Sequence, residues 1–322
     1  MGIPYKINDT RSYHVSGIST LGWELTVCNA LEETGSPCRD ILLKKDTFGN
    51  LLYDYLSSVI SMDSISSMLE IGGGYGFLMR DFLGKNPAMK AHMVEISGLL
   101  LRKQRETLRD FDVEFIQNDF FEIDTGLLRT VDLAVMNEVI GDFVTVCEVS
   151  PEIFNTPDAG PDPVLRNIKR IYLEYGLPLP GGVVTVNLGA LNAVERLCMS
   201  GIKYIYISEH SCEAAVPDEL KDRIRIASPG EPEQIRLMGH DEYTIKFSYL
   251  EKIAKKLQYR VVRGQYRDIM PFEYSDRLNF ILTSHSQKDE HEIIRQFAED
   301  LFKYEYLIMS RGDLKTFKGG NR

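Results

Sequence analysis

The sequence predicts an α/β protein built on a doubly wound, mostly parallel sheet of seven strands. Short apolar runs alternate with segments of helical periodicity from residue 67 onward. A glycine-rich turn at residues 72–76 follows the first of these runs and precedes a helical segment. Of the 322 residues, 43% are hydrophobic, which is enough to build a core. Parallel strands need helical crossovers, so we expect helices on both faces of the sheet.

Two helical stretches are predicted before the first strand. Residues 1–47 mix Gly, Ser, Thr and Cys around one helical stretch at Trp23–Glu33, so we interpret them as an N-terminal helical extension. From Phe48 to Met62, apolar residues recur at helical spacing until Asp63-Ser64 breaks the pattern. A helix is therefore expected to lead into the first strand.

The elements of the sheet follow in alternation. The expected strands are Ser67–Ile71, His92–Ile96, Val113–Gln117, Val131–Met136, Lys203–Ser208, Tyr259–Arg263 and Asn279–Thr283. The expected helices are Phe77–Leu83, Leu99–Asp110, Ala190–Ser200 and Ser248–Leu257.

The alternation stops once, in a proline-rich segment. We interpret residues 143–182 as a cap inserted into a main domain of residues 48–287, and expect it to cover the C-terminal edge of the sheet. Residues 288–322 are predicted to form an amphipathic helix, Asp289–Met309, and a tail. This helix is expected to pack on the domain or on a second subunit, so a homodimer is one arrangement to test.

Composition limits the partners and the compartment. A formal net charge of -10 argues against binding to nucleic acid. Five cysteines without paired spacing favour a reduced, cytoplasmic protein, and no apolar run is long enough to span a membrane. The six histidines are scattered without ligand spacing, so no metal site is predicted.

The glycine-rich turn indicates a nucleotide-like ligand, because such a turn lets a ligand approach the backbone closely. The dinucleotide fingerprint would need a third glycine at the position of Phe77, which disfavours an NAD-dependent oxidoreductase without removing it. The chain has instead Glu70, Gly72, Gly74 and Gly76 in the pattern E-x-G-x-G-x-G.

Polar residues close the next strands. Glu95 ends the second strand, where a carboxylate can accept hydrogen bonds from both ribose hydroxyls of a nucleoside. Asp119 and Phe120 follow the third strand, and Asn137 follows the fourth. The carboxyl ends of parallel strands share one edge of the sheet, so we expect these side chains to meet there.

The E-x-G-x-G-x-G pattern resembles the first motif of class I methyltransferases, which have a Rossmann-like fold. The resemblance implies S-adenosylmethionine as cofactor, with Gly72, Gly74 and Gly76 around its methionine part and Glu70 accepting from its ammonium group. It also implies that Asp119 accepts from the adenine amino group while Phe120 lies near the ring, and that Asn137 belongs to the cofactor site.

Residues 94–108, VEISGLLLRKQRETL, are similar to the V-E-x-S and L-R-x-x-Q-R pattern of MidA-like methyltransferases. Residues 48–52, FGNLL, and Asn137-Glu138 add to that resemblance, which covers about residues 48–142. Members of that family are linked to mitochondrial complex I assembly, and one eukaryotic branch methylates arginine in a protein. The resemblance therefore implies a protein acceptor, and a small-molecule acceptor stays open.

The chain departs from that family where an acceptor would bind. The family pattern N-E-x-x-D has Gly141 at its last position, with Asp142 one place later, and the fifth strand ends in Ser208-Glu209-His210-Ser211 instead of a D-Y-G-like sequence.

Four residues at these strand ends are candidate catalytic residues: Glu138, Asp142, Glu209 and His210. A carboxylate could hold a guanidinium group by paired hydrogen bonds, and His210 could act as a base near neutral pH. A non-catalytic scaffold or assembly protein that binds S-adenosylmethionine is the alternative, because binding the cofactor and transferring its methyl group are separable.

Overall fold

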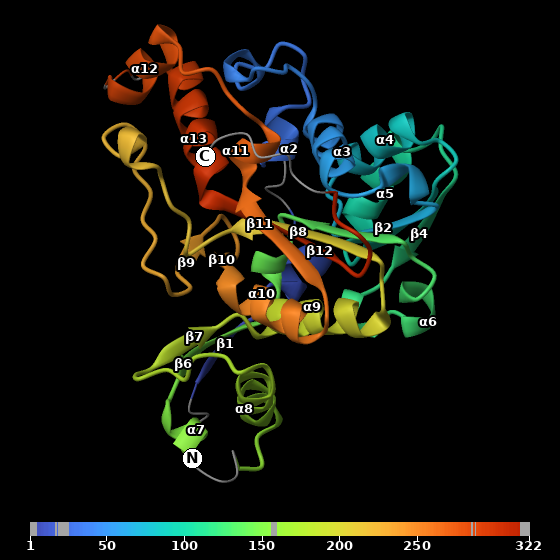
Figure 1. The fold of residues 1–322 in the computed structure, drawn as a ribbon, viewed down its shortest axis with the longest axis vertical. Helices are drawn as coiled ribbons and strands as arrows, with labels where there is room; N and C mark the ends of the chain where they lie inside the picture. The colour runs from blue at the N-terminus through green and yellow to red at the C-terminus, as the bar shows by residue number, and fades with distance from the viewer. Residues whose placement is uncertain are drawn as a thin grey trace.

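The computed structural model describes residues 5–16, 18, 26–155, 160–284, 286 and 288–315. Its centre is a sheet of seven strands, drawn across the middle of Figure 1. In the order in which they pair, the strands are β11 (Arg260–Gln265), β12 (Tyr304–Ser310), β8 (Tyr204–His210), β5 (Leu133–Asn137), β2 (Ser67–Ile71), β3 (Lys90–Glu95) and β4 (Val113–Gln117).

The sheet is mostly parallel, as predicted. The pairs β8–β5, β5–β2, β2–β3 and β3–β4 are all parallel, whereas β12 runs antiparallel to both of its neighbours. From β2 the chain moves outward through β3 to β4, and it then returns to place β5 and β8 on the other side of β2. The direction of winding therefore reverses between β2 and β5, and open α/β sheets bind ligands at such a switch point.

Helices cover both faces of the sheet, and two hydrophobic cores result. One core joins the sheet to a layer that contains α3 (Phe48–Val59), α4 (Phe77–Lys85), α11 (Tyr266–Ile269), α12 (Asp276–Thr283) and α13 (Asp289–Lys303). The other core joins it to α6 (Thr125–Leu128), α8 (Pro163–Tyr175), α9 (Leu188–Ser200) and α10 (Phe247–Lys256). Helix α5 (Gly98–Thr107) connects β3 to β4.

Smaller elements lie outside the main sheet. A three-stranded sheet pairs β1 (Lys6–Asn8), β6 (Thr145–Val149) and β7 (Val184–Val186), and a two-stranded one pairs β9 (Gln234–Arg236) with β10 (Asp241–Tyr243). The remaining helices are the short α1 (Arg11–Ser16), α2 (Val27–Ala30) and α7 (Glu152–Asn155).

Most predicted elements are confirmed within a few residues, and two predictions near the C-terminus were wrong. Asn279–Thr283, expected as a strand, belongs to helix α12, which begins after the N-cap Ser275. The helix expected over Asp289–Met309 ends at Lys303, and Tyr304–Ser310 forms strand β12 in the centre of one half of the sheet. Of the helix expected at Trp23–Glu33, residues 23–25 lie outside the described residues, and Val27–Ala30 are helical.

Helix α8, which belongs to the inserted segment, does not lie at the C-terminal edge of the sheet, where we expected that segment. Helix α8 packs on the outer side of α9 and α10, away from the main sheet, as the lower part of Figure 1 shows. Hydrogen bonds from Asn167 to Asn192 and from Tyr175 to Glu195 join α8 to α9. Within the part of the chain that the structure describes, no helix is both long and apolar enough to span a membrane.

Candidate functional site

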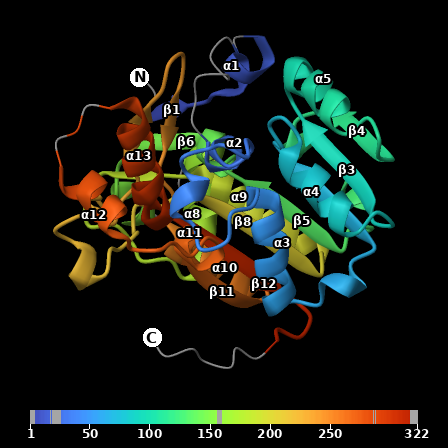
Figure 2. The same cartoon turned by 90° about the horizontal axis from the view of Figure 1, so that it is seen from above.

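A cavity of about 1020 Å³ opens at the C-terminal ends of the parallel strands. The segments that follow β2, β3, β4, β5 and β8 all contribute to its wall, so it lies at the switch point of the sheet. Opposite these strand ends, the wall is completed by α1, by residues 225–244 and by the end of α13. Figure 2 shows α1 and α2 on the same side of the molecule as this edge. Of the predicted cap, Phe143 and Val144 line the cavity.

The glycine-rich turn forms one wall of the cavity. Gly72, Gly74 and Gly76 have φ angles of 67°, 51° and 81°, which are in the left-handed region that favours glycine. A Cβ atom on Gly72 would collide with Val139, whereas one on Gly74 would meet no described atom within 4 Å. Gly74 therefore faces open space in the cavity, and a side chain there would occupy the volume of a ligand.

Glu70 lies beneath this turn and is almost completely buried, with 2% of its surface exposed. Glu70 is one of the residues that line the cavity, and its buried Oε2 atom has no hydrogen-bond partner among the described residues. Burial raises the pKa of Glu70 to about 8. A buried carboxyl oxygen without a partner costs free energy, so a cationic group in the cavity would be stabilised there.

Glu95 at the end of β3 is held in place from two sides. Its Oε1 accepts a hydrogen bond from the backbone N–H of Ser97 at 2.9 Å, and its Oε2 accepts one from Gln104 Nε2 at 3.2 Å. Gln104 Nε2 also donates to the carbonyl oxygen of Gly74 at 3.1 Å. Gln104 therefore connects α5 to both the carboxylate and the glycine-rich turn.

The predicted adenine contacts are partly occupied by the protein itself. Asp119 Oδ1 accepts from the backbone N–H of Phe121 at 2.8 Å, and its Oδ2 accepts from Arg11 at 2.9 Å. Phe120 is 3% exposed and packs with Phe121 and Phe143 at the edge of the cavity. A ligand that approached Asp119 would share it with Arg11.

Asn137 ends β5, Glu138 follows it directly, and both residues line the cavity. Glu138 has φ of 53°, an uncommon backbone conformation for a residue other than glycine. Its carboxylate accepts from Asn137 Nδ2 at 3.2 Å and from the Tyr304 hydroxyl and the Val27 N–H, both at 3.3 Å. Burial raises the pKa of Glu138 to about 7, so both protonation states are accessible near neutral pH.

Glu209 and His210 end β8. Glu209 is 3% exposed and accepts from the backbone N–H groups of Gly141 and His210 at 3.1 and 2.9 Å. Burial raises the pKa of Glu209 well above its usual range. The His210 ring packs against Tyr304, with ring centroids 3.9 Å apart. Burial therefore favours the protonated form of Glu209 relative to an exposed carboxyl.

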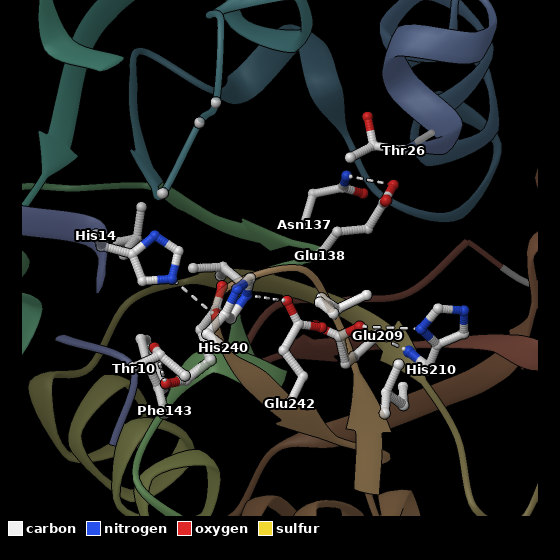
Figure 3. A pocket seen from close by; sticks show the side chains of 18 of the residues that line it. Thr10, His14, Thr26, Asn137, Glu138, Phe143, Glu209, His210, His240 and Glu242 are labelled. Atoms are coloured by element: carbon white, nitrogen blue, oxygen red, sulfur yellow. Dashed lines mark hydrogen bonds and ion pairs between the residues drawn. The ribbon is translucent and has the colours of Figure 1, made fainter. Parts of the chain in front are cut away.

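Two histidines that the sequence did not single out join Asp142. His14 Nε2 lies 2.9 Å and His240 Nε2 lies 3.5 Å from Asp142 Oδ1, and His240 Nε2 lies 3.1 Å from Glu242. Burial alone would raise the pKa of Asp142, but the two histidines lower it to about 2. Figure 3 shows His14, His240 and Glu242 along one side of the cavity, with Glu209 and His210 beyond them.

All twelve predicted site residues line the cavity or shape the turn beside it. Those that line it are Glu70, Gly72, Gly74, Glu95, Asp119, Phe120, Asn137, Glu138, Asp142, Glu209 and His210. Gly76 is the N-cap of α4 and packs against Leu108 and Gln104. Their roles stay predictions, whereas their positions are those expected at the edge of the sheet.

The fold and the cavity together define a Rossmann-like α/β protein with a ligand site at its switch point. No protein-family model matches the sequence, and no curated protein matches it. Solved structures that are similar include an uncharacterised COG1565 superfamily protein from Burkholderia thailandensis, with a TM-score of 0.49 and 14% identity over 97% of this chain and 95% of that chain.

Two further structures are similar to a comparable degree. A COG1565 superfamily member from Burkholderia thailandensis, bound to S-adenosyl-homocysteine, has a TM-score of 0.48 and 16% identity over 85% of this chain and 80% of that chain. An S-adenosylmethionine-dependent methyltransferase from Clostridium acetobutylicum has a TM-score of 0.41 and 10% identity over 83% of this chain and 91% of that chain. At these identities the similarity concerns the fold alone. The strand order of the sheet establishes that fold independently of the comparison.

Proposed function

We propose that this protein is an S-adenosylmethionine-dependent methyltransferase whose cofactor and acceptor share the cavity at the C-terminal edge of the sheet. The observation that carries the proposal is the unpartnered, buried Oε2 of Glu70 beside the open space over Gly74. A ligand with an ammonium group and a nucleoside would satisfy Glu70 and could hydrogen-bond to Glu95 through its ribose. S-adenosylmethionine has both groups.

The residues around the cavity suit this cofactor in the following way. Glu70 would accept from the ammonium group, and the turn at Gly72 and Gly74 would lie along the methionine part. Glu95, positioned by Gln104, would accept from the ribose hydroxyls. The bound cofactor supplies an electrophilic methyl group, so the protein must chiefly hold an acceptor in line and take up a proton.

Glu138 is our candidate for the group that accepts the acceptor's proton. It lies in the cavity wall, and its pKa of about 7 leaves a fraction ionised at neutral pH. Glu138 after β5, Glu209 of β8 and Glu242 of β10 all line the cavity, which favours an acceptor that is cationic or donates hydrogen bonds. An arginine side chain of a protein has both properties and stays our finer prediction, and a small molecule with a basic group is the other possibility.

Calorimetric titration tests the cofactor first. Purified protein is titrated with S-adenosylmethionine, S-adenosylhomocysteine and NAD, alongside the variants Gly74→Arg and Gly84→Arg. Gly84 is the matched control, because it lies exposed in α4 with no described atom within 4 Å of an added Cβ, outside the cavity. We expect micromolar binding of both sulfur compounds in the wild type and in Gly84→Arg, and its loss in Gly74→Arg.

Failure of both sulfur compounds to bind the folded wild type would overturn the proposal, and selective binding of NAD would favour an oxidoreductase. A labelled methyl group then tests catalysis with matched peptides that differ in one arginine or lysine. Binding without transfer to any peptide or small molecule would favour the non-catalytic scaffold.

A further inference from the structure

A cluster of histidine and carboxylate side chains forms one side of the cavity. It comprises His14 from α1, Asp142 from the turn after β5 and His240 from the turn between β9 and β10. One ligand atom from each lies within 4.8 Å of the other two. Three separate segments of the chain therefore bring imidazole nitrogens and a carboxylate oxygen to one place.

The distances from the two histidines to Asp142 fit the coordination shell of a metal ion. Ligand atoms lie about 2.1 Å from a first-row divalent ion, so neighbouring ligand atoms lie about 3.0 to 3.4 Å apart. His14 Nε2 and His240 Nε2 lie 2.9 and 3.5 Å from Asp142 Oδ1. Both distances fit neighbouring corners of a tetrahedral or octahedral shell.

The cluster is not fully satisfied by hydrogen bonds. His14 Nε2 and Asp142 Oδ1 are buried and close, yet no hydrogen bond of acceptable angle links either atom to a described residue. The side chain of His240 is 4% exposed, and its Nε2 shares a hydrogen bond with Glu242 Oε1 at 3.1 Å, whereas its Nδ1 has no partner in the described chain. His14 Nε2 and Asp142 Oδ1 can therefore each bind a third atom.

The surroundings hold the ligands in position and add negative charge. The ring of Tyr13 stacks on His240, with ring centroids 4.1 Å apart, and Thr10 Oγ1 donates to the backbone carbonyl of Asp142 at 2.8 Å. Glu242 lies 3.1 Å from His240 Nε2 and would offset the charge of a cation. Such supporting contacts strengthen metal sites by fixing the orientation of their ligands.

We propose that His14, Asp142 and His240 form a binding site for a divalent transition-metal ion such as Mn²⁺ or Zn²⁺. Two imidazoles and a carboxylate suit these ions better than Mg²⁺ or Ca²⁺, which prefer oxygen ligands. Three protein ligands leave coordination positions for water or for an oxygen atom of a molecule in the cavity, because all three residues line it. The ion site stands on this geometry alone and does not depend on the proposed methyltransferase activity.

The test is metal binding by the whole chain. Protein stripped with a chelator is titrated with MnCl₂ and, separately, with ZnCl₂, and bound metal is counted by mass spectrometry after gel filtration. We expect one ion per chain in the wild type, and at least a tenfold loss of affinity in His14→Ala and Asp142→Asn. His92→Ala is the matched control, because His92 Nδ1 lies 2.8 Å from Glu114 outside the cavity, and no third ligand joins this pair among the residues that the structure describes.

Two results would overturn the site: absence of bound metal in the folded wild type, or unchanged affinity in folded His14→Ala and Asp142→Asn. If the variants do not fold, pulsed electron paramagnetic resonance of Mn²⁺ in the wild type decides. Coupling to histidine nitrogen supports the site, and its absence contradicts it. Titration of the stripped protein with S-adenosylhomocysteine reports separately on the cofactor proposal, so failure of one does not imply failure of the other.

Discussion

At the scale of single residues, Glu138 has a backbone conformation that is uncommon for a residue other than glycine. Non-glycine residues with positive φ cost free energy and are often found at functional sites. Glu138 has φ of 53°, directly after β5 and beside the open part of the cavity. Hydrogen bonds from Tyr304 and Val27 fix its carboxylate in this orientation. The uncommon backbone conformation of Glu138 therefore goes together with a carboxylate that is fixed in the wall of the cavity.

We predict that Glu138→Gln binds S-adenosylhomocysteine as the wild type does and lowers turnover by about 10²-fold or more, the usual effect of removing a general base. In the wild type, turnover should rise with pH around the pKa of about 7, because only the ionised carboxylate accepts a proton. The rise should be absent in the variant. Calorimetry and the pH profile of turnover measure the two effects.

Glu148→Gln is the control for this experiment. Glu148 also has positive φ, at 61°, but it is exposed and pairs with Lys6 outside the cavity. Turnover should be unchanged in this variant. Unchanged turnover in Glu138→Gln as well would remove Glu138 from the reaction.

The sequence was sufficient to predict the residues that follow parallel strands. Glu70 and Glu95 could be placed because strand ends meet at one edge, whatever the details of packing. His14 and His240 could not, because they come from a short helix and a turn whose contacts depend on the tertiary fold. Arg11, which pairs with Asp119, was missed for the same reason.

At the scale of elements, helix α5 does more than connect two strands. Its residue Gln104 is completely buried and donates from one amide nitrogen to both Glu95 and Gly74. Its spacing from Leu100, Leu101 and Leu108 places it on the buried face of the helix, although its side chain is polar. The helix thus fixes the distance between the glycine-rich turn and the end of β3.

We predict that Gln104→Leu weakens binding of S-adenosylhomocysteine at least tenfold without unfolding the protein. The variant would remove the donor to Glu95 Oε2, while Oε1 keeps its hydrogen bond from the Ser97 N–H. A hydrogen bond to a charged group contributes about 1.5–3 kcal/mol. Titration calorimetry measures the affinity, and circular dichroism checks the fold. Gln117→Leu, an exposed glutamine at the end of β4, should bind normally. Equal affinities in both variants would contradict this role of α5.

The wrong predictions for α12 and β12 have one physical cause. Strand β12 is buried at all seven positions, so it shows no alternation of apolar and polar residues. A short apolar run that is buried on both sides cannot be distinguished by periodicity from the continuation of a helix. The segment Asn279–Thr283 had the composition of a strand, but Ser275 caps a helix there, and Leu278, Ile281 and Leu282 form its buried face.

At the scale of the whole molecule, folding changes the pKa of carboxyl groups that line the cavity. Folding raises the pKa of Glu70 to about 8 and that of Glu138 to about 7 from an ordinary value of 4.5. Each carboxyl therefore binds its proton more tightly in the folded chain. Above pH 4.5 the unfolded chain releases these protons first, so the folded state loses stability as the pH rises toward 8.

We predict that the ligand-free protein loses stability between pH 5 and pH 8, and that Glu70→Gln reduces this loss by up to about 1.4 kcal/mol for each pH unit. In the folded wild type, Glu70 must either keep its proton as the pH rises or carry a buried negative charge, and both cost free energy relative to the unfolded chain. The variant has no carboxyl at this position and avoids this cost. Urea unfolding at several pH values measures the free energy of unfolding for both proteins. Parallel curves for the two proteins would show that Glu70 does not titrate as its burial implies.

The place of β12 in the sheet also affects how the chain is made. It pairs with β8 on one side and β11 on the other, although it follows both in the sequence. During translation, those two strands leave the ribosome before the strand that joins them, and each presents an unpaired edge until Ser310 has emerged. Exposed strand edges pair readily with other chains. Slow translation of the last segment would therefore lengthen the period in which nascent chains depend on chaperones.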